Sequence, residues 1–195
     1  MHEIKMLLNS VFNDCTAYWN SYHKMAIAWG IIAALFYVVT LTFWLVHQQE
    51  ISKRRLVCGL IKLPFAALLG FYYCLVLGIT VFSRSAGTVR ILRLVPFATW
   101  GNDLWHLTLW VENILMMIPL GILLYILWRP FRQIGWSIFA GALFSLLIEC
   151  TQFIGRLGKF ETDDIMNNVF GMLLGFLLCK GIGRISSNYY REPQT

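Results

Sequence analysis

Acidic, amide and hydroxyl side chains interrupt the apolar stretches in the second half of this sequence. Around residues 134–153, Ser145, Glu149 and Gln152 follow one another at spacings of four and three, and Arg156 follows four residues later. Helical geometry places residues at these spacings on one face. A carboxylate in hydrocarbon is costly unless it faces a cavity or a partner. We therefore expect this polar face to lie against protein or water.

A second polar row follows in the next apolar stretch. Asp164, Asn168 and Gly171 are separated by four and three residues, again the spacing of one helical face. At a rise of about 1.5 Å per residue, Glu149 lies roughly 10 Å below Arg156, and Asn168 roughly 6 Å below Asp164. The polar loop 155–164 joins the two stretches into a hairpin, so the two rows are predicted to meet at similar depth.

Two further segments carry polar groups toward the same end of the molecule. The connection 83–106 contains several arginines, and Asn113 lies near the start of the next apolar stretch. We predict one polar pocket in the outer half of the membrane, and its candidate residues are Arg84, Arg93, Asn113, Glu149, Gln152, Arg156, Glu161, Asp164 and Asn168. Arginine binds phosphate through paired hydrogen bonds, so the pocket suits a headgroup with phosphate and amine or hydroxyl groups.

Plainer interpretations of the same residues stay open. Asp164 precedes an apolar run and could cap the helix that follows, because the first amide groups and the helix dipole favour an anion. Glu149 could pair with one arginine and only hold helices together. Glu161 and Asp163 could be solvated loop charges.

The sequence offers little sign of catalytic machinery. The four histidines form no i, i+4 pair, and the five cysteines have no C-x-x-C spacing. Catalytic residues are therefore unknown, and neither a bound metal nor a cofactor is predicted, although metal binding through oxygen atoms stays open.

The polar residues sit in a chain of membrane character. Only 13% of its 195 residues are charged, 58% are hydrophobic, and the mean hydropathy is +0.63. The fold class is predicted to be all-α, a polytopic bundle of about five transmembrane helices. The expected helices cover residues 25–46, 63–82, 109–128, 134–153 and 165–182. We attribute the net charge of +6 to basic residues that set the membrane topology and contact anionic lipid, and not to nucleic-acid binding.

We expect residues 1–24 to form an amphipathic helix on the membrane surface, because their apolar residues recur at spacings of three and four. Residues 25–195 are predicted to form a single membrane domain. Gly171 and Gly175 form a G-x-x-x-G pattern that allows close helix packing. Packing within the chain is preferred for this pattern, and a homo-oligomer is the alternative.

With five spans, the termini lie on opposite sides of the membrane. Placing the N-terminus outside puts nine basic residues inside and seven outside. We therefore predict a multi-pass membrane protein with the N-terminus outside and the C-terminus in the cytoplasm.

Roughly residues 84–182 resemble the VanZ-like family of bacterial membrane proteins, named for a teicoplanin-resistance protein. The motifs that carry the resemblance are Leu94-Val-Pro-Phe97, Glu112-Asn-Ile with Ile118-Pro-Leu-Gly121, Ile148-Glu-Cys-Thr-Gln-Phe153, and Asp164 followed by Asn168-Val-Phe-Gly171. Arg93 stands where the family usually has asparagine, and Glu161 where it usually has aspartate. The resemblance implies a protein of the bacterial cytoplasmic membrane that is linked to reduced susceptibility to teicoplanin-like glycopeptides.

These observations lead to three hypotheses. The preferred one is a non-enzymatic envelope protein that binds a membrane lipid headgroup or a lipid-linked cell-wall precursor. The second is a membrane enzyme that hydrolyses or transfers a group on an envelope lipid, with Glu149 or Asp164 as base or metal ligand. The third is a small transporter subunit, because polar residues within membranes also mark transport pathways.

Overall fold

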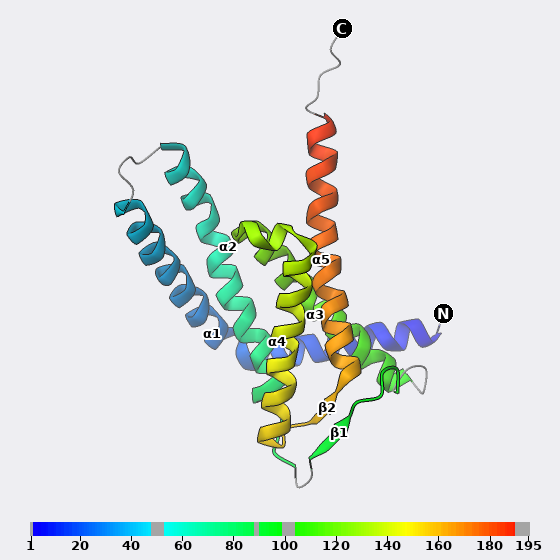
Figure 1. Cartoon of the computed structure of the whole chain (residues 1–195). Helices are drawn as coiled ribbons and strands as arrows, with labels where there is room; N and C mark the ends of the chain where they lie inside the picture. The colour runs from blue at the N-terminus through cyan, green and yellow to red at the C-terminus, as the bar shows by residue number, and fades with distance from the viewer. Residues whose placement is uncertain (1, 48–52, 88–89, 99–103, 190–195) are drawn as a thin grey trace. The chain divides into compact units, whose positions relative to one another are not determined.

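The computed structural model describes residues 2–47, 53–87, 90–98 and 104–189, with the backbone alone at 2–4, 15, 54–55, 104 and 184–189. The chain divides into two compact units, Met1–Gly87 and Thr88–Thr195. Figure 1 shows that both units are built mainly from long helices. The prediction of one membrane domain over residues 25–195 is not tested by this division.

The first unit is a pair of antiparallel helices, α1 (His2–Val46) and α2 (Lys53–Leu77), and α2 continues into a π-helical turn, Gly78–Phe82. Small residues allow the two helices to approach closely. A side chain at Gly70 would meet the Trp29 carbonyl, and one at Gly59 would meet Leu41. Late residues of α1 therefore lie against early residues of α2, the arrangement of a helical hairpin.

The N-terminal segment differs from its prediction in one respect. Residues 2–24 are helical, but no break separates them from residues 25–46, because α1 is one helix of 45 residues. Figure 1 shows the dark-blue start of α1 running in a different direction from the rest of the helix. The position of this start on a membrane surface stays a prediction.

The second unit holds three long helices: α3 (Leu104–Leu127), α4 (Ile134–Gly155) and α5 (Thr162–Tyr189). A short 3-10 helix, Arg129–Arg132, joins α3 to α4. Large apolar side chains of α3 and α5 are buried together and form the core of this unit; they are Met117, Leu120, Leu123, Met172 and Phe176.

The G-x-x-x-G pattern of α5 packs against α3 within the same chain. A side chain at Gly171 would collide with the Ile114 carbonyl, and one at Gly175 with the Ile118 carbonyl. These glycines therefore allow the backbones of α3 and α5 to touch, which is the intramolecular packing preferred from the sequence. A homo-oligomer through the same residues stays an untested alternative.

Two short strands were not expected from the sequence. β1 (Ile91–Arg93) and β2 (Lys159–Glu161) pair in parallel, with Arg93 opposite Glu161. β1 comes from the connection before α3, and β2 comes from the turn between α4 and α5. The pair therefore ties two separate parts of the chain together at one end of the second unit (Figure 1).

The all-α fold class is confirmed, with this small strand pair as the exception. In the described part of the chain, five helical segments are long and apolar enough to span a membrane. Predicted helix boundaries were less accurate. α2 begins at Lys53, ten residues before the predicted start at residue 63, so the basic residues 53–55 belong to the first turn of the helix and not to the connection before it. α5 begins at Thr162, three residues earlier than predicted.

Candidate functional site

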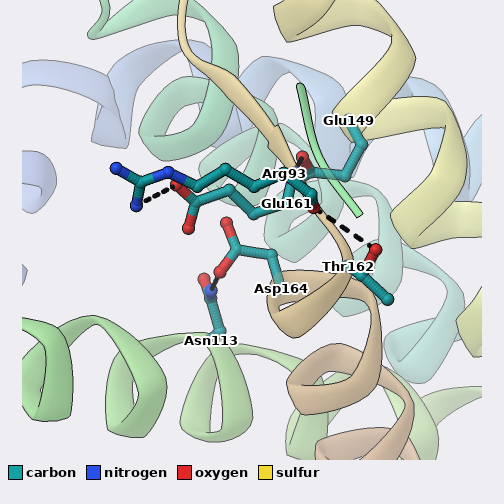
Figure 2. Close-up of polar contacts among 6 residues, drawn as sticks. All are labelled: Arg93, Asn113, Glu149, Glu161, Thr162 and Asp164. Atoms are coloured by element: carbon teal, nitrogen blue, oxygen red, sulfur yellow. Dashed lines mark hydrogen bonds and ion pairs between the residues drawn. The ribbon is translucent and has the colours of Figure 1, made fainter. Parts of the chain in front are cut away.

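An ion pair lies on the strand pair at one end of the second unit. Arg93 Nη1 is 3.2 Å from Glu161 Oε1, and the two residues are register partners on β1 and β2. Residues opposite each other in a strand pair project to the same face, which brings these side chains together. Thr162 Oγ1 also donates to the Arg93 carbonyl at 3.4 Å. Figure 2 shows Arg93 and Glu161 pointing toward each other beside Thr162.

Glu149, the buried acid of α4, is hydrogen-bonded to this strand pair. Glu149 is 1% exposed, and its Oε2 accepts a hydrogen bond from the Glu161 backbone N–H at 2.9 Å. The carboxylate of α4 therefore contacts the last residue of β2, and Figure 2 shows Glu149 beside Glu161. A charged acceptor makes this a stronger bond than a neutral pair would give. Glu149 thus positions the residue that pairs with Arg93.

Deeper in the unit, the two predicted polar rows touch. Asn168 Nδ2 donates to Ser145 Oγ at 2.8 Å, and both side chains are buried. Gln152, one turn beyond Glu149, is also buried. Among the described residues, Asn168 Oδ1 and Asn167 Nδ2 have no hydrogen-bond partner. The α4–α5 interface is therefore polar along part of its length.

Asn113 of α3 contacts the first turn of α5. Its Nδ2 donates to Asp164 Oδ1 at 2.8 Å (Figure 2). The capping interpretation of Asp164 is wrong in its detail, because the helix begins at Thr162 and Asp164 lies inside the first turn. A carboxylate in this turn still interacts favourably with the helix dipole. Asp164 therefore combines a favourable helix position with a link to α3.

The neighbouring Asp163 was not among the predicted site residues, and its interpretation as a solvated loop charge is wrong, because it is only 3% exposed. Its Oδ1 accepts a hydrogen bond from the Phe97 backbone N–H at 2.6 Å, and the residue is buried. Phe97 has φ of 61°, in the left-handed region that costs a bulky side chain about 1–2 kcal/mol. The Asp163 carboxylate thus holds a strained turn in place. No sequence pattern signalled this contact, because the two residues are 66 positions apart.

Leu94 and Val95 also line a cavity of about 410 Å³. Its walls are Leu92, Arg93, Leu94, Val95, Ala98 and His106. Four of these residues are apolar, and Arg93 adds a guanidinium, so the cavity combines a hydrocarbon wall with a group that attracts an anion. His106 was assigned no chemistry from the sequence. Its place in this cavity depends on the fold of the 90–98 segment.

Two of the predicted site arginines, Arg84 and Arg156, are exposed and take no part in the contacts described above. Arg156 is exposed and forms the left-handed C-cap of α4 with φ of 58°, so the prediction that it continues the helical face of Glu149 is wrong. The helix ends at Gly155, because Leu157 N–H bonds back to the Gln152 carbonyl at 2.8 Å and closes the last turn. Arg84 is exposed and belongs to the first unit. Its membership of the site stays a prediction.

Two sets of contacts lie at one end of the second unit: Arg93 and Glu149 both contact Glu161, and Asn113 contacts Asp164. We call these five residues together the polar cap. In the part of the chain that the structure describes, no group of three or more His, Cys, Asp or Glu side chains is placed to hold a metal ion. The polar cap can bind and orient a charged or polar group through the Arg93 guanidinium, beside an apolar cavity.

These features define a helical membrane protein in which a polar cap closes one end of a three-helix unit. The VanZ/LLP1 family model matches residues 65–184, and the chain belongs to this family. Protein VanZ from Enterococcus faecium is 35% identical over 91 residues, which cover 46% of this chain and 52% of that protein. The chain thus spans about half the length of this curated relative. No solved structure matches the chain.

Proposed function

We propose that this protein binds the phosphate-bearing headgroup of an envelope lipid or lipid-linked cell-wall precursor and thereby lowers susceptibility to teicoplanin-type glycopeptides. The observation that carries the proposal is the cavity of about 410 Å³ in which Arg93 and His106 lie among apolar side chains. Its volume falls in the range typical of small-molecule sites, about 300–1,000 Å³. A lipid phosphate needs a cationic donor next to hydrocarbon, and the Arg93 guanidinium among apolar side chains provides this combination.

Arg93 is suited to this role by its donors and its exposure. A guanidinium carries five N–H donors, and the ion pair with Glu161 is made through Nη1. The side chain is 38% exposed, so a phosphate can reach it from the cavity. Glu161 then acts as an internal anion that competes with the phosphate. The site should therefore prefer a headgroup that carries two negative charges or accepts several hydrogen bonds, because such a headgroup can outcompete the Glu161 carboxylate for Arg93.

The proposed side of the membrane agrees with a role in glycopeptide resistance. The N-out, C-in topology places β1, β2 and the cavity at the outer face of a bacterial cytoplasmic membrane. Glycopeptides act outside this membrane on cell-wall precursors. A protein that holds precursor headgroups at this face would limit the access of the drug to these precursors without any chemical step.

The test is the minimum inhibitory concentration of teicoplanin for cells that express the wild type or a variant, with membrane levels measured for each. The variants are Arg93→Gln, Glu149→Gln and Asp164→Asn, which remove charge; the two acid-to-amide changes also keep side-chain size. Lys159→Gln is the matched control, because Lys159 is an exposed base on the same strand pair. We expect protection to fall in the three variants and to persist in the control. Unchanged protection at equal abundance in all three would refute the proposal.

A second measurement separates binding from catalysis. Purified protein is incubated with a radiolabelled lipid-linked precursor, and both bound lipid and released products are quantified. We expect saturable binding that weakens in Arg93→Gln and no consumption of the lipid. Consumption of the lipid would favour the enzyme alternative, and uptake of label into sealed vesicles would favour the transporter alternative.

A further inference from the structure

A second group of basic and aromatic residues surrounds the turn between α3 and α4. Between residues 113 and 148 the sequence contains two charged residues, and both are arginines. We call this group the α3–α4 platform, and it consists of Trp128, Arg129, Phe131, Arg132, Trp136 and Phe139. The nearest acids in sequence are Glu112 and Glu149, so no acid within this segment neutralises the platform.

The two arginines share one side of the connecting helix. Arg129 and Arg132 are three residues apart on the 3-10 helix Arg129–Arg132, where positions i and i+3 eclipse each other. Arg132 Nε donates to the Tyr125 carbonyl at 3.3 Å, and its guanidinium lies 5.7 Å from the centre of the Tyr125 ring. Arg132 is thus held in place while it stays exposed, and Arg129 is exposed beside it.

An open, largely apolar depression of about 360 Å³ lies on the residues that follow Arg132 in sequence. Gln133, Gly135, Trp136 and Phe139 line this cavity. The Trp136 and Phe139 rings meet edge to face with centres 6.0 Å apart, and both side chains are about half exposed. A side chain built at Gly135 would meet nothing within 4 Å, so the cavity has room at this position.

We propose that the α3–α4 platform is a binding site for an anionic phospholipid. Arg129 and Arg132 bind the phosphate, and one acyl chain lies against the exposed faces of Trp136 and Phe139. The two arginines, which form no salt bridge among the described residues, complement the anionic headgroup, and tryptophan side chains favour the boundary between headgroups and hydrocarbon. A membrane lipid is therefore favoured over a protein segment as the occupant.

This site is separate from the cavity at Arg93. α4 has 22 residues and is therefore about 33 Å long, close to the hydrocarbon thickness of about 30 Å. The platform lies at the start of α4, and Glu149 and the polar cap lie near its end. The two sites thus face opposite sides of the membrane, whichever way the chain is inserted, and this inference does not rest on the proposed function.

The test uses the full chain in phosphatidylcholine nanodiscs that contain a trace of photoreactive lipid. The photoreactive group sits on the acyl chain of phosphatidylglycerol in one sample and of phosphatidylcholine in the other. We expect labelling of residues 133–139 by the anionic lipid to exceed labelling by the neutral lipid at least about fivefold, because each of the two arginines contributes about that factor near an anionic headgroup. High salt should reduce this difference, since it screens exposed charges.

Variants then assign the preference to the arginines. Arg129→Gln and the double variant Arg129→Gln/Arg132→Gln should bring anionic labelling down toward the neutral level, and Lys159→Gln should leave it unchanged. Arg129→Gln keeps the Arg132 contacts with Tyr125, so it tests the charge even if the double variant does not fold. Equal labelling of the wild type by both lipids, or an undiminished preference in Arg129→Gln and the double variant, would overturn the proposal.

Discussion

Arg93 and Glu161 are opposite each other in the parallel strand pair, and their side chains form an ion pair of 3.2 Å at the edge of the Arg93 cavity. The backbone fixes both partners, because Arg93 is in β1 and Glu161 receives a second anchor from Glu149. The arginine that lines the cavity is therefore already neutralised by a carboxylate of the same chain. This relationship makes Glu161 the residue to change first.

Replacing Glu161 with glutamine should strengthen binding of an anionic headgroup by several-fold. Glutamine keeps the backbone N–H that bonds Glu149 but removes the competing charge beside Arg93. The loss of stability should stay below about 1 kcal/mol, because partly exposed ion pairs contribute little. Titration of a fluorescent lipid-linked precursor analogue into purified wild type and Glu161→Gln measures the change. Equal or weaker binding by the variant would show that Glu161 does not compete for Arg93.

The hydrogen bond between Asn113 and Asp164 should couple α3 to the first turn of α5. We expect a double-mutant cycle of Asn113→Ala and Asp164→Ala to give a coupling energy of about 0.5–2 kcal/mol. The reason is that the bond is 2.8 Å long, partly buried and made to a carboxylate. Reversible unfolding in mixed micelles provides the measurement. Additive effects of the two changes would mean that the bond adds no stability.

Asp163 should control the order of the turn at Phe97. Asp163→Ala removes the acceptor of the Phe97 N–H, whereas Asp163→Asn retains an oxygen at the same place. We expect an unfolding cost of about 1–3 kcal/mol for the alanine variant and a smaller cost for asparagine. Hydrogen exchange of residues 94–98 should accelerate mainly in the alanine variant. Similar protection in both variants would show that the strained turn holds without this acceptor.

Gly171 should be far less tolerant of a methyl group than Gly181 on the same helix. A Cβ at Gly171 would collide with the backbone of α3, whereas one at Gly181 would meet nothing within 4 Å. Gly171→Ala should therefore cost about 1–3 kcal/mol through overpacking. Gly181→Ala serves as the matched control and should change little, which thermal unfolding in detergent can measure. Equal unfolding temperatures would contradict the close α3–α5 packing.

Much of the fold followed from hydrophobic length alone. Stretches of about 20 apolar residues are long enough to span hydrocarbon, and a backbone in lipid must satisfy its own hydrogen bonds, so helices were the expected elements. Residue spacing also predicted correctly that the polar row containing Ser145 meets the polar row containing Asn168, because both rows lie inside regular helices. Helix ends were predicted poorly where polar residues continue a helix beyond the apolar stretch, as at Lys53 and Thr162.

Only the tertiary structure decided which residues of the polar cap contact one another. The sequence marked Arg93, Asn113, Glu149, Glu161 and Asp164 as candidates, but periodicity says nothing about partners that are dozens of residues apart. The strand pair at Arg93 and Glu161 is three residues long on each side, too short to leave a pattern. The Asp163 contact with Phe97 and the place of His106 in the cavity likewise depend on the path of residues 90–98. Sequence determined which residues are costly in hydrocarbon, and the fold determined which of them compensate one another.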